Sequence, residues 1–90
     1  MNWTDETIKG KILHKLSRHG KFQHSHTAME HLHTGFPAHV VGQVKDMISA
    51  LKSEGLLLVK HTNYGAQVSI NVKQLERVMQ YIDDFLKEKN

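Results

Sequence analysis

Histidine is unusually frequent in this chain, with 8 in 90 residues. Four of the histidines fall within ten positions: His24, His26, His31 and His33. Imidazole and carboxylate side chains bind zinc, and a helix that began early would place His26, Glu30 and His33 on one side. That spacing matches no recognised ligand pattern, and a helix that begins after residue 27 leaves His26 in a loop. A histidine-dependent metal or pH sensor is therefore only a third hypothesis, and the first expectation is no metal and no cofactor.

Basic residues are concentrated near the start of the chain, where no acidic residue lies between Thr7 and Lys21. They are Lys9, Lys11, Lys15, Arg18 and Lys21. On a helical wheel, part of this group forms a basic stripe within about 100° of arc. The basic stripe consists of Lys11, His14, Lys15 and Arg18. Such a stripe can follow a phosphate backbone and release its counterions. The alternative is a solvated helix face that binds nothing.

A helix predicted over residues 38–54 carries polar side chains on the side away from its apolar face. They are His39, Gly42, Gln43, Lys45, Asp46, Ser49, Lys52 and Ser53. In a DNA major groove, Gln43 would pair with adenine, Lys45 would reach guanine or a phosphate, and Ser49 would permit close approach. Asp46 would repel phosphates unless it accepts from cytosine or pairs with a neighbouring lysine. The alternative is an ordinary exposed helix face.

Two β-favouring runs, residues 56–60 and 66–70, are separated by a polar linker and predict a hairpin. Polar and aromatic side chains gather near its expected tip: Lys60, His61, Asn63, Tyr64 and Gln67. An aromatic side chain at such a tip stacks on an unpaired base, or it folds back over the core of the domain. The hairpin therefore supplies three candidate nucleic-acid contacts, which are Lys60, Asn63 and Tyr64.

The sequence lacks the patterns of catalytic sites. No serine lies in a nucleophile-elbow context, and no glycine-rich phosphate loop or zincin motif occurs. Asp83 and Asp84 are adjacent on a predicted helix, so their carboxylates point in different directions. The core is expected to use nearly all the apolar residues, which leaves little to line a substrate pocket. We therefore expect a binding protein without a small-molecule substrate, and not an enzyme.

Capping residues and apolar periodicity locate the elements that carry these side chains. Thr4 is a candidate N-cap, and Gly20 is a candidate left-handed stop for the same helix. Thr27 and Glu30 form a candidate capping box for a second helix, and Asn71 caps a final one. The predicted elements are helices over residues 5–19, 28–34, 38–54 and 72–88 and a hairpin over residues 56–70.

Residues 27–71 resemble a winged helix-turn-helix, because two helical patterns run through residues 54–58 into the hairpin. An extended piece around Phe22 would pair with that hairpin. The resemblance implies an α+β, mainly α fold with a three-helix core, a C-terminal β-hairpin wing and an additional C-terminal helix. It also implies that the helix over 38–54 enters a major groove while the wing and first helix contact phosphates. This superfamily contains DNA binders, RNA binders and protein-interaction modules.

Composition places the chain among small globular domains. Its 90 residues are 39% hydrophobic, which suits one domain with a single core. Cysteine is absent, and the net charge of +3 permits an anionic partner. Asp5 and Glu6 interrupt any signal-like segment, and no apolar run approaches the ~20 residues of a membrane span. We expect a single cytoplasmic domain over residues 1–90 with no membrane partner.

The last predicted helix has an apolar stripe longer than a small core needs. It comprises Leu75, Val78, Met79, Ile82, Phe85 and Leu86. Winged regulators that resemble this layout dimerise through terminal helices, which spaces two recognition helices about one DNA turn apart. Phe85 and Leu86 lie near the chain end, where fewer partners remain to cover them, so a homodimer through this helix is one expectation. The alternative is that the helix packs across the first helix and closes the core.

The leading hypothesis is a nucleic-acid-binding protein, of the type of a DNA-binding transcriptional regulator, that binds duplex DNA. The second hypothesis is a protein–protein interaction module of the same fold without nucleic-acid binding. Asp46 and the weakly basic helix over 38–54 would suit this second hypothesis.

Overall fold

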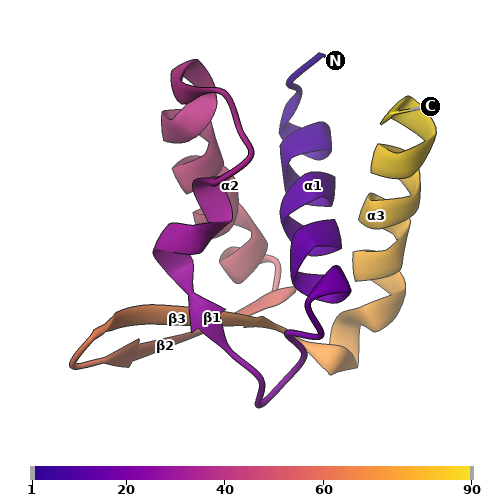
Figure 1. Ribbon diagram of the computed structural model, residues 1–90. Coiled ribbons are helices and arrows are strands. Elements are labelled where there is room, and N and C mark those ends of the chain that lie inside the picture. Colours follow the sequence, from indigo (N-terminus) through magenta and orange to yellow (C-terminus); the bar gives the residue numbers. More distant parts are fainter. Residues whose placement is uncertain (1, 90) are drawn as a thin grey trace.

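The computed structural model describes residues 2–89 and shows an α+β, mainly helical domain. Three α-helices stand side by side above a small antiparallel sheet (Figure 1). The elements in chain order are α1 Asp5–Arg18, β1 Thr27–Ala28, the 3-10 helix η1 Met29–His33, the 3-10 helix η2 Ala38–Val40, α2 Val41–Ser53, β2 Leu57–Thr62, β3 Gly65–Ile70, the 3-10 helix η3 Val72–Gln74 and α3 Leu75–Lys89. No helix among residues 2–89 is long and apolar enough to cross a bilayer.

Helix α1 begins and ends where local chemistry favours it. Thr4 accepts a hydrogen bond from the Thr7 amide at 3.2 Å, which satisfies one of the free N–H groups of the first turn. The chain leaves the helix after Arg18, and Gly20 adopts a left-handed φ of +66°. The helix is therefore one residue shorter than the predicted 5–19.

The short helix predicted over residues 28–34 is present as the 3-10 helix η1, which begins at Met29 and ends at His33. Thr27 and Ala28 before it form the short strand β1, which pairs with Val68 and Gln67 of β3. The N-cap is therefore Ala28, which has no side-chain acceptor, and the predicted capping box does not form. The Thr27 hydroxyl instead lies 3.4 Å from a ring nitrogen of His31.

The sheet has the order β1-β3-β2 and is antiparallel throughout. The extended piece expected around Phe22 makes a single bridge to Ile70, so the third strand lies later in the chain than predicted. In the hairpin, Thr62 pairs directly with Gly65, which leaves a two-residue turn rather than the five-residue linker expected. Gly65 adopts a φ of +111°, a conformation that favours glycine.

The segment predicted as one helix over residues 38–54 begins as η2 and continues as α2. Its inward side chains Val44, Ile48 and Leu51 join the common core, and Gly55 ends it with a φ of +79°. The last helix divides in the same way. Asn71 caps η3 by accepting from the Lys73 amide, and α3 follows from Leu75, whereas one helix over 72–88 was predicted.

Helices α1 and α3 pack closely because Gly10 has no side chain at their contact. A Cβ atom at position 10 would lie 2.5 Å from Phe85 Cβ and 2.6 Å from the Tyr81 carbonyl oxygen. Phe85 is therefore buried against α1, with only 4% of its surface exposed. The expectation that few partners within the chain would cover Phe85 is wrong, because Phe85 packs against α1 at Gly10.

Glu54, just after α2, joins the three helices through a partly buried charge cluster. Its Oε2 lies 2.9 Å from Lys9 Nζ as an ion pair that lacks hydrogen-bond alignment, and its Oε1 accepts from Arg77 and Tyr81, each at 2.9 Å. Burial works against ionisation of Glu54, but the contacts with Lys9, Tyr81 and Arg77 outweigh it and lower its pKa. Burial likewise opposes the charge on Lys9, yet Glu54 raises the Lys9 pKa. The cluster links α1 and α3 to the end of α2.

We predict that Gly10→Ala destabilises the domain by about 2 kcal/mol, because the new methyl group must push α3 away from α1. Gly42→Ala is the matched control, since nothing lies within 4 Å of a Cβ there. Helix propensity alone would stabilise both variants by up to ~1 kcal/mol. Urea unfolding of the two variants measures the difference. Equal stability of the two variants would show that the α1–α3 contact can accommodate a methyl group at position 10.

We predict that Glu54→Gln lowers the free energy of unfolding by about 1–2 kcal/mol at neutral pH. A carboxylate whose pKa is lowered by folding stabilises the folded chain at pH values above its ordinary pKa. This stabilisation is lost as the pH falls through the lowered pKa of the folded chain. The difference between wild type and variant should therefore shrink as the pH falls below the ordinary pKa of glutamate. Urea unfolding across this pH range tests the prediction, with Glu76→Gln on the exposed side of α3 as control. A pH-independent difference would contradict the role assigned to the charge.

Candidate nucleic-acid interface

The outer face of α2 presents a short row of polar side chains to solvent. Lys45, Ser49 and Lys52 are exposed on this face, and Asp46 is exposed beside them. No ion pair joins Asp46 to either lysine within residues 2–89, so of the two ways considered for offsetting its charge, pairing with a neighbouring lysine is not present. His39 is exposed on η2, before the helix begins. The face is available to a partner, but it is only weakly basic.

Gln43 lies on a different side of α2 from Lys45. Its amide nitrogen donates to the Trp3 carbonyl oxygen at 3.2 Å and to Asp5 Oδ1 at 3.0 Å. Positions 43 and 45 differ by roughly 200° around a helix of 3.6 residues per turn. The assignment of Gln43 to the polar outer face is therefore wrong, because this side chain fastens the start of α1 to α2.

The hairpin tip holds the most exposed aromatic residue in residues 2–89. Tyr64 is 99% exposed, so it does not fold back over the core. Thr62 fixes the turn beneath it, because its hydroxyl accepts from the Tyr64 amide and donates to the Gly65 carbonyl. Lys60, His61 and Asn63 are also exposed. The turn thus presents a whole phenol ring to the surroundings on a fixed backbone.

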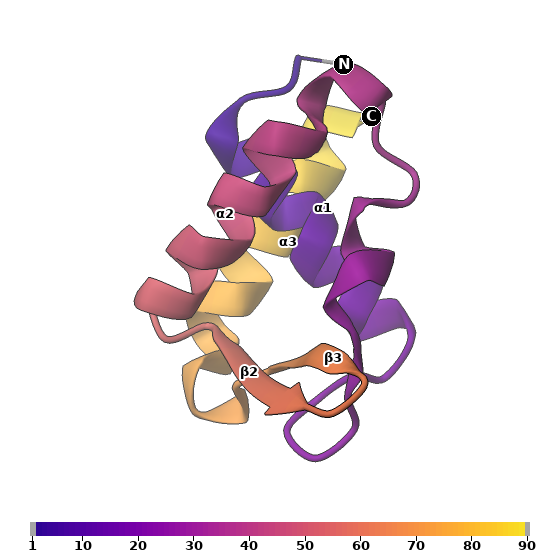
Figure 2. The same ribbon diagram turned by 90° about the vertical axis from the view of Figure 1, so that its left-hand side faces the viewer.

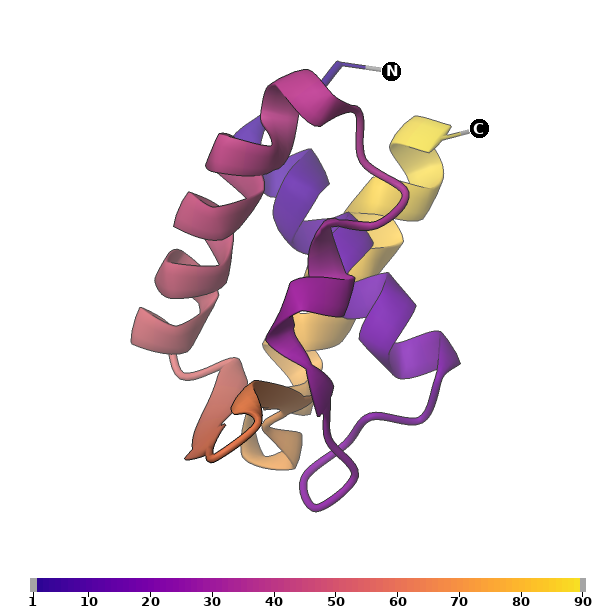
Figure 3. The same ribbon diagram turned by 60° about the vertical axis from the view of Figure 1, so that its left-hand side comes forward.

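A hollow of about 530 Å³ connects the hairpin tip to α2, and we call it the hairpin hollow. It is lined by Ala28, Met29, Glu30, His33, Lys45, Ile48, Tyr64, Gly65 and Ala66. Figure 2 shows the hairpin lying below α2, and Figure 3 shows η1 beside it. Lys45 and Tyr64, which are far apart in sequence, therefore border one concave surface.

The basic stripe on α1 is not the free solvent-facing row that was predicted. Lys11 Nζ donates to the Gly35 carbonyl at 2.8 Å and lies 5.0 Å from the Phe36 ring centroid and 5.2 Å from that of Trp3. Lys15 Nζ donates to the His31 carbonyl at 2.6 Å and to both oxygens of Thr34. These ammonium groups hold the chain segment between η1 and η2 against α1.

The other two members of the basic stripe differ in their surroundings. The His14 ring packs against the Phe85 ring, with centroids 5.8 Å apart. Arg18 is exposed and has no hydrogen bond or ion pair within the described chain. Burial and the charge of Lys11 lower the pKa of Lys15. Arg18 is therefore the stripe residue best placed to meet a phosphate.

The predicted contact residues fall on two separate surfaces. Lys45 and Tyr64 border the hairpin hollow, whose η1 lining residues include Glu30 and His33. Lys15 lies across η1, in a hollow lined by His31 and Thr34. The η1 segment therefore stands between the basic stripe and the α2–hairpin surface. These are two separate candidate contact surfaces.

The structure adds residues to the α2–hairpin surface that the sequence did not suggest. Met29, Glu30 and His33 line the hairpin hollow from η1. The sides of η1 on which they lie depend on the three residues per turn of a 3-10 helix, whereas the sequence predicted only a short helix there. The histidine-rich pattern contained a signal for His33, but it was interpreted as metal chemistry. Within residues 2–89 no three His, Asp or Glu side chains gather as ligands, so the hypothesised site with His26 is not formed.

Of the apolar stripe predicted for a dimer contact, only Leu75 and Met79 are exposed. Val78 and Ile82 are buried with Phe85, and Leu86 is partly buried against the core. The exposed apolar side chains are Val72, Leu75 and Met79, at 43%, 40% and 40% of their surface. They occupy the first turns of the helix region, beside the sheet, and form what we call the apolar strip.

Comparison of the chain with protein-family models, with curated proteins and with solved structures finds no match.

We predict that Lys15→Met lowers the free energy of unfolding by about 1–2 kcal/mol, because three acceptors lose their donor. Arg18→Met removes the same charge from the same helix face and is the matched control, for which a change within about 0.5 kcal/mol is expected. Chemical unfolding of both variants provides the measurement. Equal losses would mean that Lys15 does not hold the η1 segment.

Proposed function

We propose that this chain is a nucleic-acid-binding domain of the winged helix-turn-helix type, which contacts duplex DNA through the outer face of α2 and the tip of the β2–β3 hairpin. In this proposal α2 lies along the major groove, and the hairpin rests against the neighbouring backbone. The proposal concerns binding, and it assigns no catalytic residue.

The arrangement of elements supports the winged helix assignment. Helix α2 leads directly into the hairpin, and β1 pairs with the middle of the hairpin strand β3, so the hairpin is held on one edge and its tip projects beyond α2 (Figure 1). The short η1 takes the place of the second helix of such domains. A projecting hairpin beside an exposed helix supplies two elements that can straddle a DNA strand.

The exposed ring of Tyr64 beside Lys45 is the observation that carries the proposal. Keeping a tyrosine 99% in water forgoes the free energy of burying its ring, which would favour the folded chain. A ring held on a tight turn, with an ammonium group across the same hollow, suits a partner that is both flat and anionic. Nucleic acid combines these properties in its sugar, base and phosphate groups.

The charges favour moderate affinity. Lys52 of α2 and Lys60 of β2 add positive charge to this side of the molecule, while Asp46 and Glu30 oppose it. Ser49, between Lys45 and Lys52, is short enough for close approach of α2 to the bases. Because no arginine lies on this face of α2, phosphate contacts are expected to contribute more than recognition of particular bases.

We predict that the chain binds mixed-sequence duplex DNA with a marked salt dependence. Lys45→Gln should reduce the slope of log affinity against log salt by ~0.9, because one phosphate contact is lost. Tyr64→Ala should weaken binding about fivefold, whereas Tyr64→Phe keeps the ring and should retain most of the affinity. Fluorescence anisotropy at several salt concentrations measures both effects.

The control is Lys87→Gln, which removes an equal charge from the exposed side of α3. It should leave the slope unchanged. If Lys87→Gln and Lys45→Gln behave alike, the binding is a general response to charge and the proposed surface is wrong. Absence of binding even at low salt would contradict the proposal as a whole.

The apolar strip supports a second candidate function, a protein-interaction module that pairs with a second copy through α3. Val72, Leu75 and Met79 repeat at helical spacing and remain about two-fifths exposed. If this strip is a dimer contact, Met79→Lys should give a monomer, while Gln80→Lys adds the same charge on a neighbouring face and should leave the dimer intact. Sedimentation equilibrium at ~100 µM tests this candidate. A wild-type chain that is monomeric at that concentration would exclude it.

A further inference from the structure

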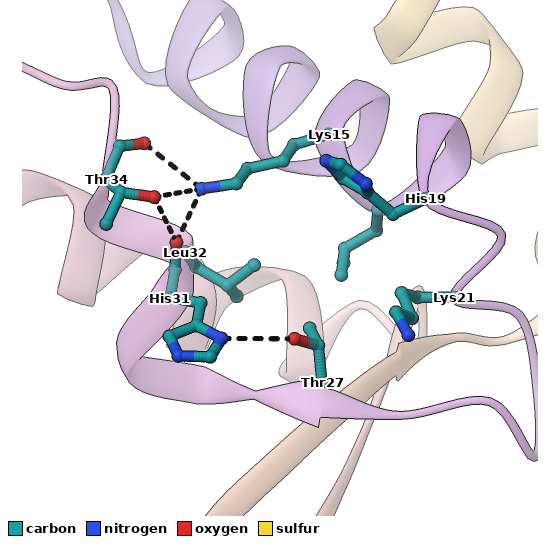
Figure 4. Close-up of a pocket in the computed structure, with 8 residues that line it drawn as sticks. Lys15, His19, Lys21, Thr27, His31, Leu32 and Thr34 are labelled. Atoms are coloured by element: carbon teal, nitrogen blue, oxygen red, sulfur yellow. Dashed lines mark hydrogen bonds between the residues drawn. The ribbon is translucent and has the colours of Figure 1, made fainter.

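A second concave site lies on the other side of η1 from the hairpin hollow, and we call it the basic hollow. Its volume is about 330 Å³. It is lined by Lys15, Leu16, His19, Lys21, Thr27, His31, Leu32 and Thr34. Figure 4 shows these side chains converging from the C-terminal half of α1, from the following loop and from the β1–η1 segment. A hollow of this size falls in the range of small-ligand sites.

The charges around the basic hollow have one sign. Lys15, His19, Lys21 and His31 carry positive or protonatable groups, and the lining contains no aspartate or glutamate. Cationic groups that face a common concavity repel one another and attract an anion, and field lines concentrate in a concave site. The hollow therefore favours a negatively charged ligand.

Lys15 contributes charge rather than a free donor. Its ammonium group already donates to the His31 carbonyl and to both oxygens of Thr34, so three acceptors take its three protons (Figure 4). Hydrogen bonds to a ligand must come from other side chains. Figure 4 shows His19 beside the Lys15 side chain at the end of α1 and Lys21 on the loop that follows, and these two side chains are the candidate donors.

Thr27 and His31 form a pair that an anion would organise. The Thr27 hydroxyl lies 3.4 Å from His31 Nδ1, and either atom can be the donor. When Nδ1 carries the proton and donates to the hydroxyl oxygen, the hydroxyl proton is released to donate toward the hollow. A bound anion favours this arrangement, because the Thr27 hydroxyl then presents its proton to the anion and not an oxygen lone pair.

Most of the accessible surface of the basic hollow is carbon. Leu16 and Leu32 are only 1% and 0% exposed, so this carbon belongs mainly to the lysine, histidine and threonine side chains of the lining. A bare inorganic ion would leave this surface in water. A ligand with an organic body would cover it, and burial of apolar surface is favourable.

We propose that the basic hollow binds a small phosphate ester, with the phosphate between His19, Lys21 and the Thr27 hydroxyl and the organic body against the carbon surface of the lining. This site goes beyond the nucleic-acid proposal and does not depend on it, because the α2–hairpin surface lies across η1. It also revises the expectation that the chain takes no small molecule. A DNA backbone phosphate is the competing occupant, and the experiment below separates the two.

The basic hollow and the α2–hairpin surface are structurally connected, because η1 lines both. His31 and Thr34 border the basic hollow, while Glu30 and His33 border the hairpin hollow. One short 3-10 helix thus forms a wall of both. A ligand that draws His31 inward displaces a segment that also lines the hairpin hollow, so the two sites share a structural element.

The test is an amide NMR titration of the whole chain at about pH 6.5, where imidazole side chains are partly protonated. The probes are phenyl phosphate, inorganic phosphate and phenol. Phenyl phosphate should give saturable shifts at the residues lining the basic hollow. Inorganic phosphate should bind about tenfold more weakly, since it lacks the organic body, and phenol should produce no saturable shift.

Single substitutions test which side chains of the basic hollow contribute to the affinity for phenyl phosphate. Lys21→Gln and His19→Gln each remove one donor from the rim and should weaken phenyl phosphate binding about fivefold. Both residues are partly or fully exposed, so their replacement leaves the core intact. Lys87→Gln, on the exposed side of α3, is the matched control and should leave the affinity unchanged.

Four results would overturn the proposal. They are no saturable shift up to ~20 mM phenyl phosphate, shifts centred on other surfaces, equal binding of inorganic and phenyl phosphate, and equal effects of Lys21→Gln and Lys87→Gln. A short DNA duplex that shifts the lining residues when phenyl phosphate does not would assign the hollow to a backbone phosphate instead. Saturable shifts in the basic hollow that persist when DNA binding fails would support the site independently of the proposed function.

Discussion

The hydrogen bonds from Lys11 and Lys15 to the chain between η1 and η2 determine how this small domain presents its surfaces. This segment has too few residues to form an α-helix and, apart from Leu32 and Phe36, contributes little to the core. Two ammonium groups from α1 satisfy its backbone carbonyls instead. The acceptor residues His31, Thr34 and Gly35 are exposed, so the lysines act by tying η1 and the chain after it to α1, and this fixes the position of η1.

Once η1 is fixed, the surface divides into two concave regions. The hairpin hollow lies between η1, α2 and the hairpin, and the basic hollow lies between η1 and α1. The first combines an exposed aromatic ring with a lysine and carries the proposed nucleic-acid contact. The second combines positive groups with a carbon surface and carries the proposed small-anion site. Both depend on an element of five residues in which side chains three positions apart share a side, so Glu30 and His33 line the hairpin hollow while His31 lines the basic hollow.

Local chemistry was sufficient to predict the parts of the fold where the sequence contains strong signals. The Thr4 and Asn71 caps and the left-handed Gly55 act in the structure as local rules suggest. Sequence could not predict β1, since pairing with β3 depends on residues some 40 positions away and overrides the helical pattern after Thr27. Nor could it predict that Lys11 and Lys15 meet backbone carbonyls. A helical wheel identifies the face of a side chain, but it does not identify the loop that covers that face.

The nucleic-acid account is tested most directly by mapping where DNA touches the chain. Amide NMR spectra recorded with and without a short mixed-sequence duplex should shift at positions 45, 49 and 63–65, on the outer face of α2 and at the hairpin tip. Positions 72–79, around the apolar strip of α3, should remain unchanged. Shifts confined to α3, or no shifts at saturating DNA, would contradict the account and favour a protein partner.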